Sequence, residues 1–289
     1  MLLSAAFALL VAAEPVKPFE FKDGDRVVWI GSTLVEREQK FGHWETALIA
    51  ANPDKNITFR NLGWSGDTVH AESRGRFDFS NPEKCFKQLV DQTLALKPTV
   101  IFVSYGTNES FEGKEGLPKF EKGLEKLLDA FKPTGARVVL FSPLPFEKAA
   151  SLPDPKPANA NLALYSDAIK AIAEKRGARF ADLFGFRGSG PYTDNGIHPN
   201  EIGYSTATPL LLASLGLSDP RGSEQFEQLR RIVIAKNEQF FNKWRPQNET
   251  YLTGFRKHEQ GKNAKEAAEF DPFIEKAEDA IVKIRKGLK

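Results

Sequence analysis

Short apolar runs recur along the first two thirds of the chain, and turn-forming residues, mainly glycine and proline, bound them. Five of these runs predict strands, near residues 27–31, 57–62, 100–105, 137–142 and 178–183. Short runs rich in β-branched residues and bounded by turn residues are typical of strands buried in a parallel sheet.

Helical periodicity occupies intervals between these runs. Residues 120–131 place apolar side chains on one face, and residues 162–175 do the same. This strand–helix alternation predicts an α/β fold, in which a parallel sheet carries helices on both faces. Ligands of such sheets bind at the carboxyl ends of the strands, so candidate site residues are expected there.

The last quarter of the chain has a different pattern. A long amphipathic helix is predicted for residues 225–244, a polar and aromatic stretch with few helix signals follows, and a second, charged helix is predicted for residues 271–288. The apolar face of the first helix needs a partner. We therefore expect a main domain of residues 19–220 and a helical C-terminal extension of residues 221–289 that packs on or beside it.

The first thirteen residues are apolar almost throughout. The segment from Leu2 to Ala13 carries no charge, and its small residues before Glu14 resemble a signal-peptidase cleavage site. Because the segment is too short to span a bilayer, we interpret residues 1–13 as a signal peptide and expect an exported protein, periplasmic or extracellular, with no membrane span in its mature form. A buried N-terminal helix is the alternative.

Composition narrows the function classes. Hydrophobic residues make up 41% of the chain, charged residues 27%, and the formal net charge is +2, which gives no basis for nucleic-acid binding. Cys85 is the single cysteine, so an intrachain disulfide is excluded. The four histidines do not pair at metal-ligand spacing, and we expect no metal site.

Polar residues and glycines cluster in four segments, three directly after predicted strands and one further along the chain. The segments are residues 31–34, 61–68, 105–110 and 194–200. They supply hydroxyls at Ser32 and Thr33, a side-chain amide at Asn108 that can donate to an oxyanion, and a candidate general base at His198. Each segment alone also has a structural explanation, since Ser and Thr commonly cap helices.

Taken together, the four segments resemble the sequence blocks of the SGNH (GDSL-like) hydrolase family in order, spacing and strand context. Residues 31–34 resemble its Gly-Asp-Ser-Leu block, and the likeness covers about residues 23–215. The resemblance implies that Gly66 and Asn108 form the oxyanion hole and that His198 is the base.

The family resemblance also implies a fold and a reaction. The fold is a three-layer, doubly wound, flavodoxin-like sheet of five parallel strands in the order 2-1-3-4-5. The reaction is hydrolysis of carboxylic esters by acyl transfer, often of acetyl groups on carbohydrate, with no metal or organic cofactor. The expected partner is a small-molecule or polysaccharide ester.

Two central positions depart from the family pattern. Thr33 stands where the family has its nucleophilic serine, with Ser32 in place of the aspartate before it. Asn195 stands where the family has the aspartate that orients the histidine, and Asp194 lies one residue earlier, so the candidates to orient His198 are Asp194 and Asn195 itself. The threonine methyl group restricts χ1 and crowds the approach to a carbonyl, and an asparagine cannot stabilise an imidazolium by charge.

These departures leave three hypotheses open. The first is an esterase in which Thr33, rather than Ser32, attacks the substrate. The second is a carbohydrate- or acyl-binding module that has kept the pocket but lost turnover. The third is an interaction domain of a larger secreted assembly, suggested by the charged terminal helices.

Overall fold

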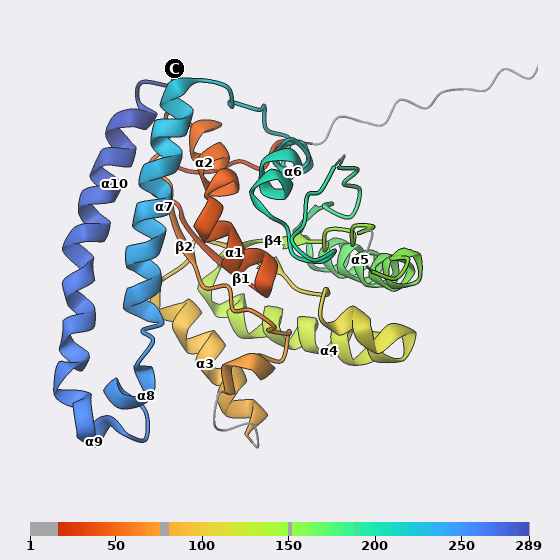
Figure 1. Ribbon diagram of the computed structural model, residues 1–289, viewed down its shortest axis with the longest axis horizontal. Helices are drawn as coiled ribbons and strands as arrows, with labels where there is room; N and C mark the ends of the chain where they lie inside the picture. Colours follow the sequence, from red (N-terminus) through yellow and green to blue (C-terminus); the bar gives the residue numbers. More distant parts are fainter. Residues whose placement is uncertain (1–16, 76–80, 150–151, 189, 289) are drawn as a thin grey trace, which may run out of the picture.

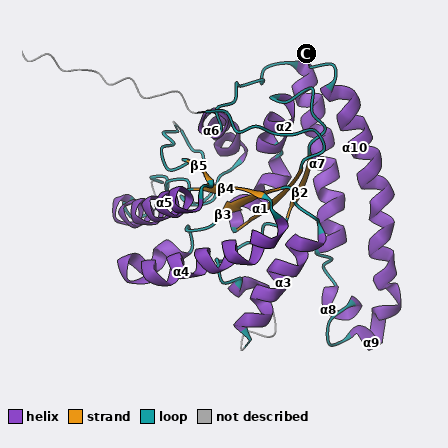
Figure 2. Cartoon of the chain, turned by 180° about the vertical axis from the view of Figure 1, so that it is seen from behind, coloured by secondary structure: helices purple, strands orange, loops and turns teal. Residues whose placement is uncertain are grey.

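The computed structural model describes residues 17–75, 81–149, 152–188 and 190–288, and within these ranges it contains one parallel sheet (Figures 1 and 2). Its strands are β1 (Arg26–Gly31), β2 (Thr58–Asn61), β3 (Val100–Ser104), β4 (Arg137–Phe141) and β5 (Arg179–Ala181). The five strands lie in the order β2-β1-β3-β4-β5, which confirms the predicted topology. The predicted signal peptide, residues 1–13, lies outside the described residues.

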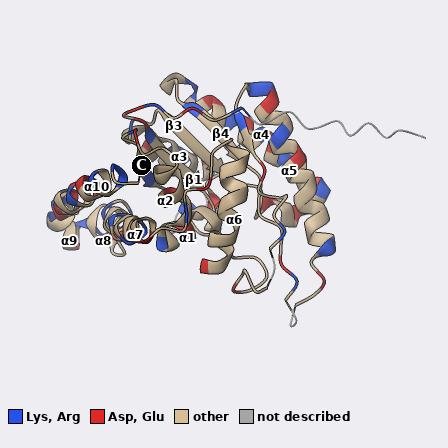
Figure 3. Ribbon diagram, turned by 90° about the horizontal axis from the view of Figure 1, so that it is seen from above, with Lys and Arg blue, Asp and Glu red and all other residues tan. Residues whose placement is uncertain are grey.

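Helices cover both faces of this sheet. The main-domain helices are α1 (Thr33–Phe41), α2 (His43–Ala50), α3 (Pro82–Ala95), α4 (Gly113–Phe131), α5 (Lys156–Arg176) and α6 (Glu201–Ser214). Short 3₁₀ helices are η1 (Glu72–Gly75), η2 (Glu109–Glu112) and η3 (Lys132–Thr134). Basic and acidic residues are interspersed on outer helices such as α5 (Figure 3).

Two apolar cores, one on each face of the sheet, join the sheet to the helices that cover it and so form three layers. Val27 and Trp29 of β1 point into a core shared with α2 and α6, whereas Val28 and Ile30 point into a core shared with α3, α4 and α5. Alternate residues of a strand face opposite sides of the sheet, so a strand with helices on both sides must be apolar at nearly every position. This requirement is why a continuous apolar run marked β1 in the sequence.

The C-terminal extension packs against the β2 edge of the sheet (Figure 1). It consists of α7 (Glu224–Trp244), α8 (Glu249–Leu252), α9 (Lys257–Gln260), η4 (Gly261–Phe270) and α10 (Asp271–Arg285). The stretch after α7 is more helical than its composition indicated. Along α7, the buried ammonium of Lys236 contacts Glu45 of α2 and donates a hydrogen bond to the Phe59 carbonyl of β2 at 3.1 Å. The extension therefore shares buried polar contacts with the main domain.

No helix within the described ranges is long and apolar enough to cross a membrane.

Candidate active site

The turn after β1 presents the first candidate residues. A side chain at Gly31 would bring its Cβ to 2.4 Å from the Ser104 carbonyl oxygen of β3, so only glycine fits this close strand approach. The turn leads directly into α1, which begins at Thr33. Ser32 is buried at 3% exposure and its hydroxyl does not cap α1, whereas Thr33 is partly exposed. Of the two hydroxyl residues, Thr33 is therefore the more accessible to a substrate.

The loop of residues 62–69, which we call the Gly66 loop, meets this turn. Gly66, in the left-handed region at φ +75°, donates its backbone N–H to Thr33 Oγ1 at 3.0 Å. Asn108, after β3, donates from Nδ2 to the Asp67 carbonyl at 2.7 Å. The structure thus links Thr33, Gly66 and Asn108 through the hydrogen bonds of one loop.

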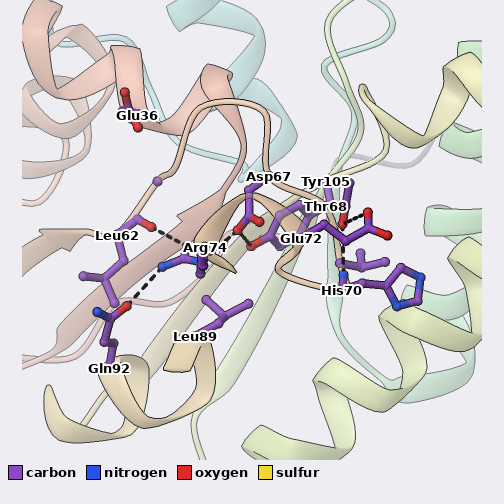
Figure 4. Close-up of polar contacts among 12 residues, drawn as sticks. Glu36, Leu62, Asp67, Thr68, His70, Glu72, Arg74, Leu89, Gln92 and Tyr105 are labelled. Carbon is purple, nitrogen blue, oxygen red and sulfur yellow. Dashed lines mark hydrogen bonds and ion pairs between the residues drawn. The ribbon is translucent and has the colours of Figure 1, made fainter. Parts of the chain in front are cut away.

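Buried charged groups hold the Gly66 loop in place (Figure 4). Arg74 donates from Nε to Asp67 Oδ2 at 2.8 Å, with both side chains fully buried, and from Nη2 to the Leu62 carbonyl at 2.9 Å. The hydroxyl of Tyr105 donates to Asp67 Oδ2 at 3.3 Å. Arg74 therefore connects the beginning of the loop to the residue after Gly66.

Glu109 supplies a second connection. Its carboxylate accepts the Val69 N–H at 2.8 Å and the Gly106 N–H at 2.9 Å, so it joins the Gly66 loop to the turn after β3. Burial raises the pKa of Glu109 to about 7. Sequence reasoning did not select Glu109 or Arg74, although Glu109 directly follows Asn108 in the third segment.

His198 lies in the loop before α6, next to Asn195. Asn195 Oδ1 accepts the backbone N–H of His198 at 2.9 Å and that of Ile197 at 3.3 Å. These two donors fix the orientation of the amide, so Nδ2 faces His198 Nδ1 at 3.1 Å. Because the amide nitrogen only donates, His198 Nδ1 accepts, and the ring proton of the neutral imidazole sits on Nε2. A general base at Nε2 needs the opposite tautomer.

Asp194, the other candidate to orient His198, has a different ionic partner in the structure. Its carboxylate is paired with Arg37, one turn after Thr33 on α1, and Arg37 also donates to the Pro199 carbonyl at 3.3 Å. Burial and, to a smaller extent, the Arg37 charge lower the pKa of His198, while Asp194 opposes this shift. Arg37 was missed at the sequence level, where nothing in its helical position marked it as a partner for Asp194.

The candidate nucleophile Thr33 and the candidate base His198 come from segments that the structure joins, because Arg37 of α1 contacts the loop that carries His198. In the part of the chain that the structure describes, no hydrogen bond joins Thr33 Oγ1 to His198, and their pairing stays a prediction.

The same described residues contain no group of three His, Cys, Asp or Glu side chains that could hold a metal ion.

Comparison with known proteins identifies relatives of the main domain. The model of the GDSL-like lipase/acylhydrolase family matches residues 24–205, a range that holds all four polar segments and ends before α7. An acetylxylan esterase from Xylanibacter ruminicola is 24% identical over 229 residues, covering 68% of this chain and 44% of that protein. This chain therefore spans less than half the length of that relative.

Solved structures show the same architecture. A catalytic mutant of an acetylxylan esterase from Geobacillus stearothermophilus superposes with a TM-score of 0.54 at 18% identity, covering 71% of this chain and 100% of that one. The structure of that esterase without a named substitution gives a TM-score of 0.52 at 19% identity over 69% of this chain and 98% of its own. At this identity the likeness shows a shared fold.

Proposed function

Because the chain belongs to the GDSL-like lipase/acylhydrolase family, we propose that it hydrolyses carboxylic esters at the site around Thr33, with acetyl groups on carbohydrate as the substrate class. The observation that carries the proposal is the 3.0 Å hydrogen bond from the Gly66 N–H to Thr33 Oγ1. An oxyanion donor already lies beside a partly exposed hydroxyl, which is the arrangement that acyl transfer requires.

The proposed reaction gives each of these residues a role. Thr33 Oγ1 attacks the ester carbonyl and its proton passes to His198. The carbonyl oxygen, now negative, accepts hydrogen bonds from the Gly66 N–H and from the Asn108 Nδ2 hydrogen that the Asp67 carbonyl does not use. The protonated His198 then donates to the departing alcohol, and water hydrolyses the acyl-threonine with His198 again as the base.

Proton transfer is the demanding step in this scheme. His198 accepts a proton at Nε2 only after its own proton moves to Nδ1, where the Asn195 amide nitrogen faces it. Rotating the amide would turn Oδ1 toward Nδ1 but would remove the acceptor of the His198 N–H. The proposed enzyme is therefore slow relative to one with an aspartate at this position, since the wrong tautomer costs about 10⁴ in turnover in a serine triad.

The carbohydrate part of the proposal is supported by the relatives, which are acetylxylan esterases. Exposure of Gly66 and of the Asp194–Asn195 turn supports a site open to a polymer rather than a closed cavity. We also propose export, on the basis of the apolar residues 1–13.

A second candidate function is binding of acylated carbohydrate without turnover. The specific observation in its favour is the Asn195 geometry, which holds His198 as an Nε2–H donor. Such a donor binds a carbonyl or hydroxyl oxygen but does not activate Thr33.

Assays of the purified full chain with p-nitrophenyl acetate and with acetylated xylan test the proposal. We expect steady release of p-nitrophenol and acetate that is lost in Thr33→Ala. Binding of acetylated xylan with no acetate release, in the wild-type chain and in Thr33→Ser alike, would replace the esterase by the binding function.

A further inference from the structure

Trp244 and Arg245 of the C-terminal extension both contact Trp64 of the Gly66 loop beside the candidate active site. Arg245 follows the last residue of α7, and its backbone N–H donates to the Phe241 carbonyl at 2.9 Å. Its guanidinium carbon lies 3.7 Å from the centre of the Trp64 ring, in the Gly66 loop, a cation–π contact. The guanidinium also pairs with Glu36 of α1, and both side chains are about four-fifths buried.

Glu36 carries this contact to the oxyanion donor. Its carboxylate accepts the Ser65 N–H at 2.7 Å and the Ser65 hydroxyl at 2.8 Å. Ser65 directly precedes Gly66, whose N–H is the proposed oxyanion donor, and Glu36 stands three residues after Thr33. A continuous series of contacts thus runs from the end of α7 through Arg245, Glu36 and Ser65. It leads to Gly66, whose N–H contacts Thr33 Oγ1.

A second ion pair holds the other side of Gly66. Asp67, the residue after Gly66, pairs with the buried Arg74, whose guanidinium carbon lies 5.1 Å from the same Trp64 ring. The two anchors differ in origin, because Arg74 lies within the family match of residues 24–205 whereas Arg245 lies outside it. The extension has therefore added an anchor to a loop that the main domain already fixes on one side.

We infer that Arg245 is a positioning residue, which holds Glu36 against Ser65 and so fixes the oxyanion donor of Gly66 relative to Thr33. The inference rests on the proposed esterase function of this site. Without the guanidinium, Glu36 is a mostly buried carboxylate with no cationic partner among the described residues, and desolvation favours its turning toward water and releasing Ser65.

The inference predicts which kinetic constant changes. An oxyanion donor stabilises the transition state more than the bound ester, so a displaced Gly66 N–H lowers kcat and leaves KM nearly constant. Loss of a single donor costs about 10²- to 10³-fold, and a loop that is loosened rather than removed should lose about 10- to 100-fold in kcat.

The experiment compares Arg245→Met, which removes the charge but keeps a long side chain, with Arg245→Lys, which keeps the charge. The matched control is Arg256→Met, since Arg256 is a charged residue of the same extension that pairs with Glu259 and Tyr251. Hydrogen–deuterium exchange is measured on peptides covering residues 62–69, and kcat and KM are measured with p-nitrophenyl acetate.

We expect faster exchange of the Gly66 loop and the lower kcat in Arg245→Met, partial recovery of both in Arg245→Lys, and wild-type values in Arg256→Met. Exchange of the loop in Arg245→Met at the wild-type rate would overturn the inference. An equal loss of kcat in Arg256→Met would also overturn it, because it would mean that the whole extension had loosened.

The exchange measurement separates this inference from the proposed function. If the wild-type chain hydrolyses no ester but Arg245→Met still loosens the loop selectively, esterase function fails and the positioning contact stands. If hydrolysis is normal and exchange of the loop does not respond to Arg245, the positioning role fails and the esterase function stands.

Discussion

The two halves of the candidate site are built differently. In the half that we propose to bind the carbonyl, Gly66 and Asn108 belong to a network whose charged members, Asp67 and Arg74, are fully buried. In the half that we propose to move protons, Asp194 and Asn195 are exposed. The Asp194 carboxylate is paired with Arg37, and the amide oxygen of Asn195 accepts hydrogen bonds from two backbone N–H groups.

This difference indicates where a reaction at the site is limited. Stabilisation of an oxyanion depends on donors fixed before the substrate arrives, and the buried Asp67–Arg74 pair holds the loop of the proposed donor Gly66 in this way. Removal of a proton from Thr33 needs a histidine with a free acceptor nitrogen and a stabilised cationic form. The Asn195 contact places the ring proton on the nitrogen that should accept, and the Arg37 charge disfavours the cationic form. The site should therefore polarise an ester well and activate its nucleophile poorly.

The largest expected effect is the removal of the nucleophile. Thr33→Ala should lower kcat about 10³-fold or more, because the residual rate comes only from binding and the oxyanion donors. Ser32→Ala is the matched control and should keep most of the activity, since Ser32 is buried and Thr33 is the hydroxyl that meets Gly66. Turnover of p-nitrophenyl acetate measures both, and the opposite ranking would give Ser32 the role of nucleophile.

The next largest expected effect is an increase in kcat. Asn195→Asp supplies oxygens for both the backbone donors and His198 Nδ1, so it should select the basic tautomer and stabilise the imidazolium. We expect kcat to rise by about 10- to 100-fold, below the limit of about 10⁴ set by the reverse change in a serine triad. The control is Asp194→Asn, which alters a neighbouring carboxylate that faces Arg37. No gain in Asn195→Asp would mean that His198 is not limited by its partner.

The smallest effect is a shift in pH dependence. His198 acts as a base only when deprotonated, and its pKa is lowered from 6.5, so the acid limb of kcat/KM should lie below pH 6.5. Arg37→Gln removes a nearby positive charge, which raises the His198 pKa and moves the limb to higher pH. The pH–rate profile of Lys40→Gln, which removes an exposed charge from the same helix, should match the wild type. An unshifted limb in Arg37→Gln would exclude His198 as the titrating base.

Much of the fold could be predicted from the sequence because its signals are local. The strand β1 is a continuous apolar run, as a strand buried on both faces must be, and α7 is marked by its amphipathic repeat. The four polar segments could be found for the same reason, since each is a short stretch of neighbouring residues. The order of the strands followed from the resemblance of these segments to one family.

Only the tertiary structure decided which ionic partners the charged residues around the candidate site have. Arg37 and Asp194 are 157 positions apart, and Arg245 and Glu36 are 209 positions apart, so no local pattern connects them. Asp194 looked available to His198 in the sequence, but folding places it against a guanidinium on α1. The physical reason is that the packing of the helices determines which partner lies within reach, and for Arg245 and Glu36, which are about four-fifths buried, a charged group taken out of water needs such a partner.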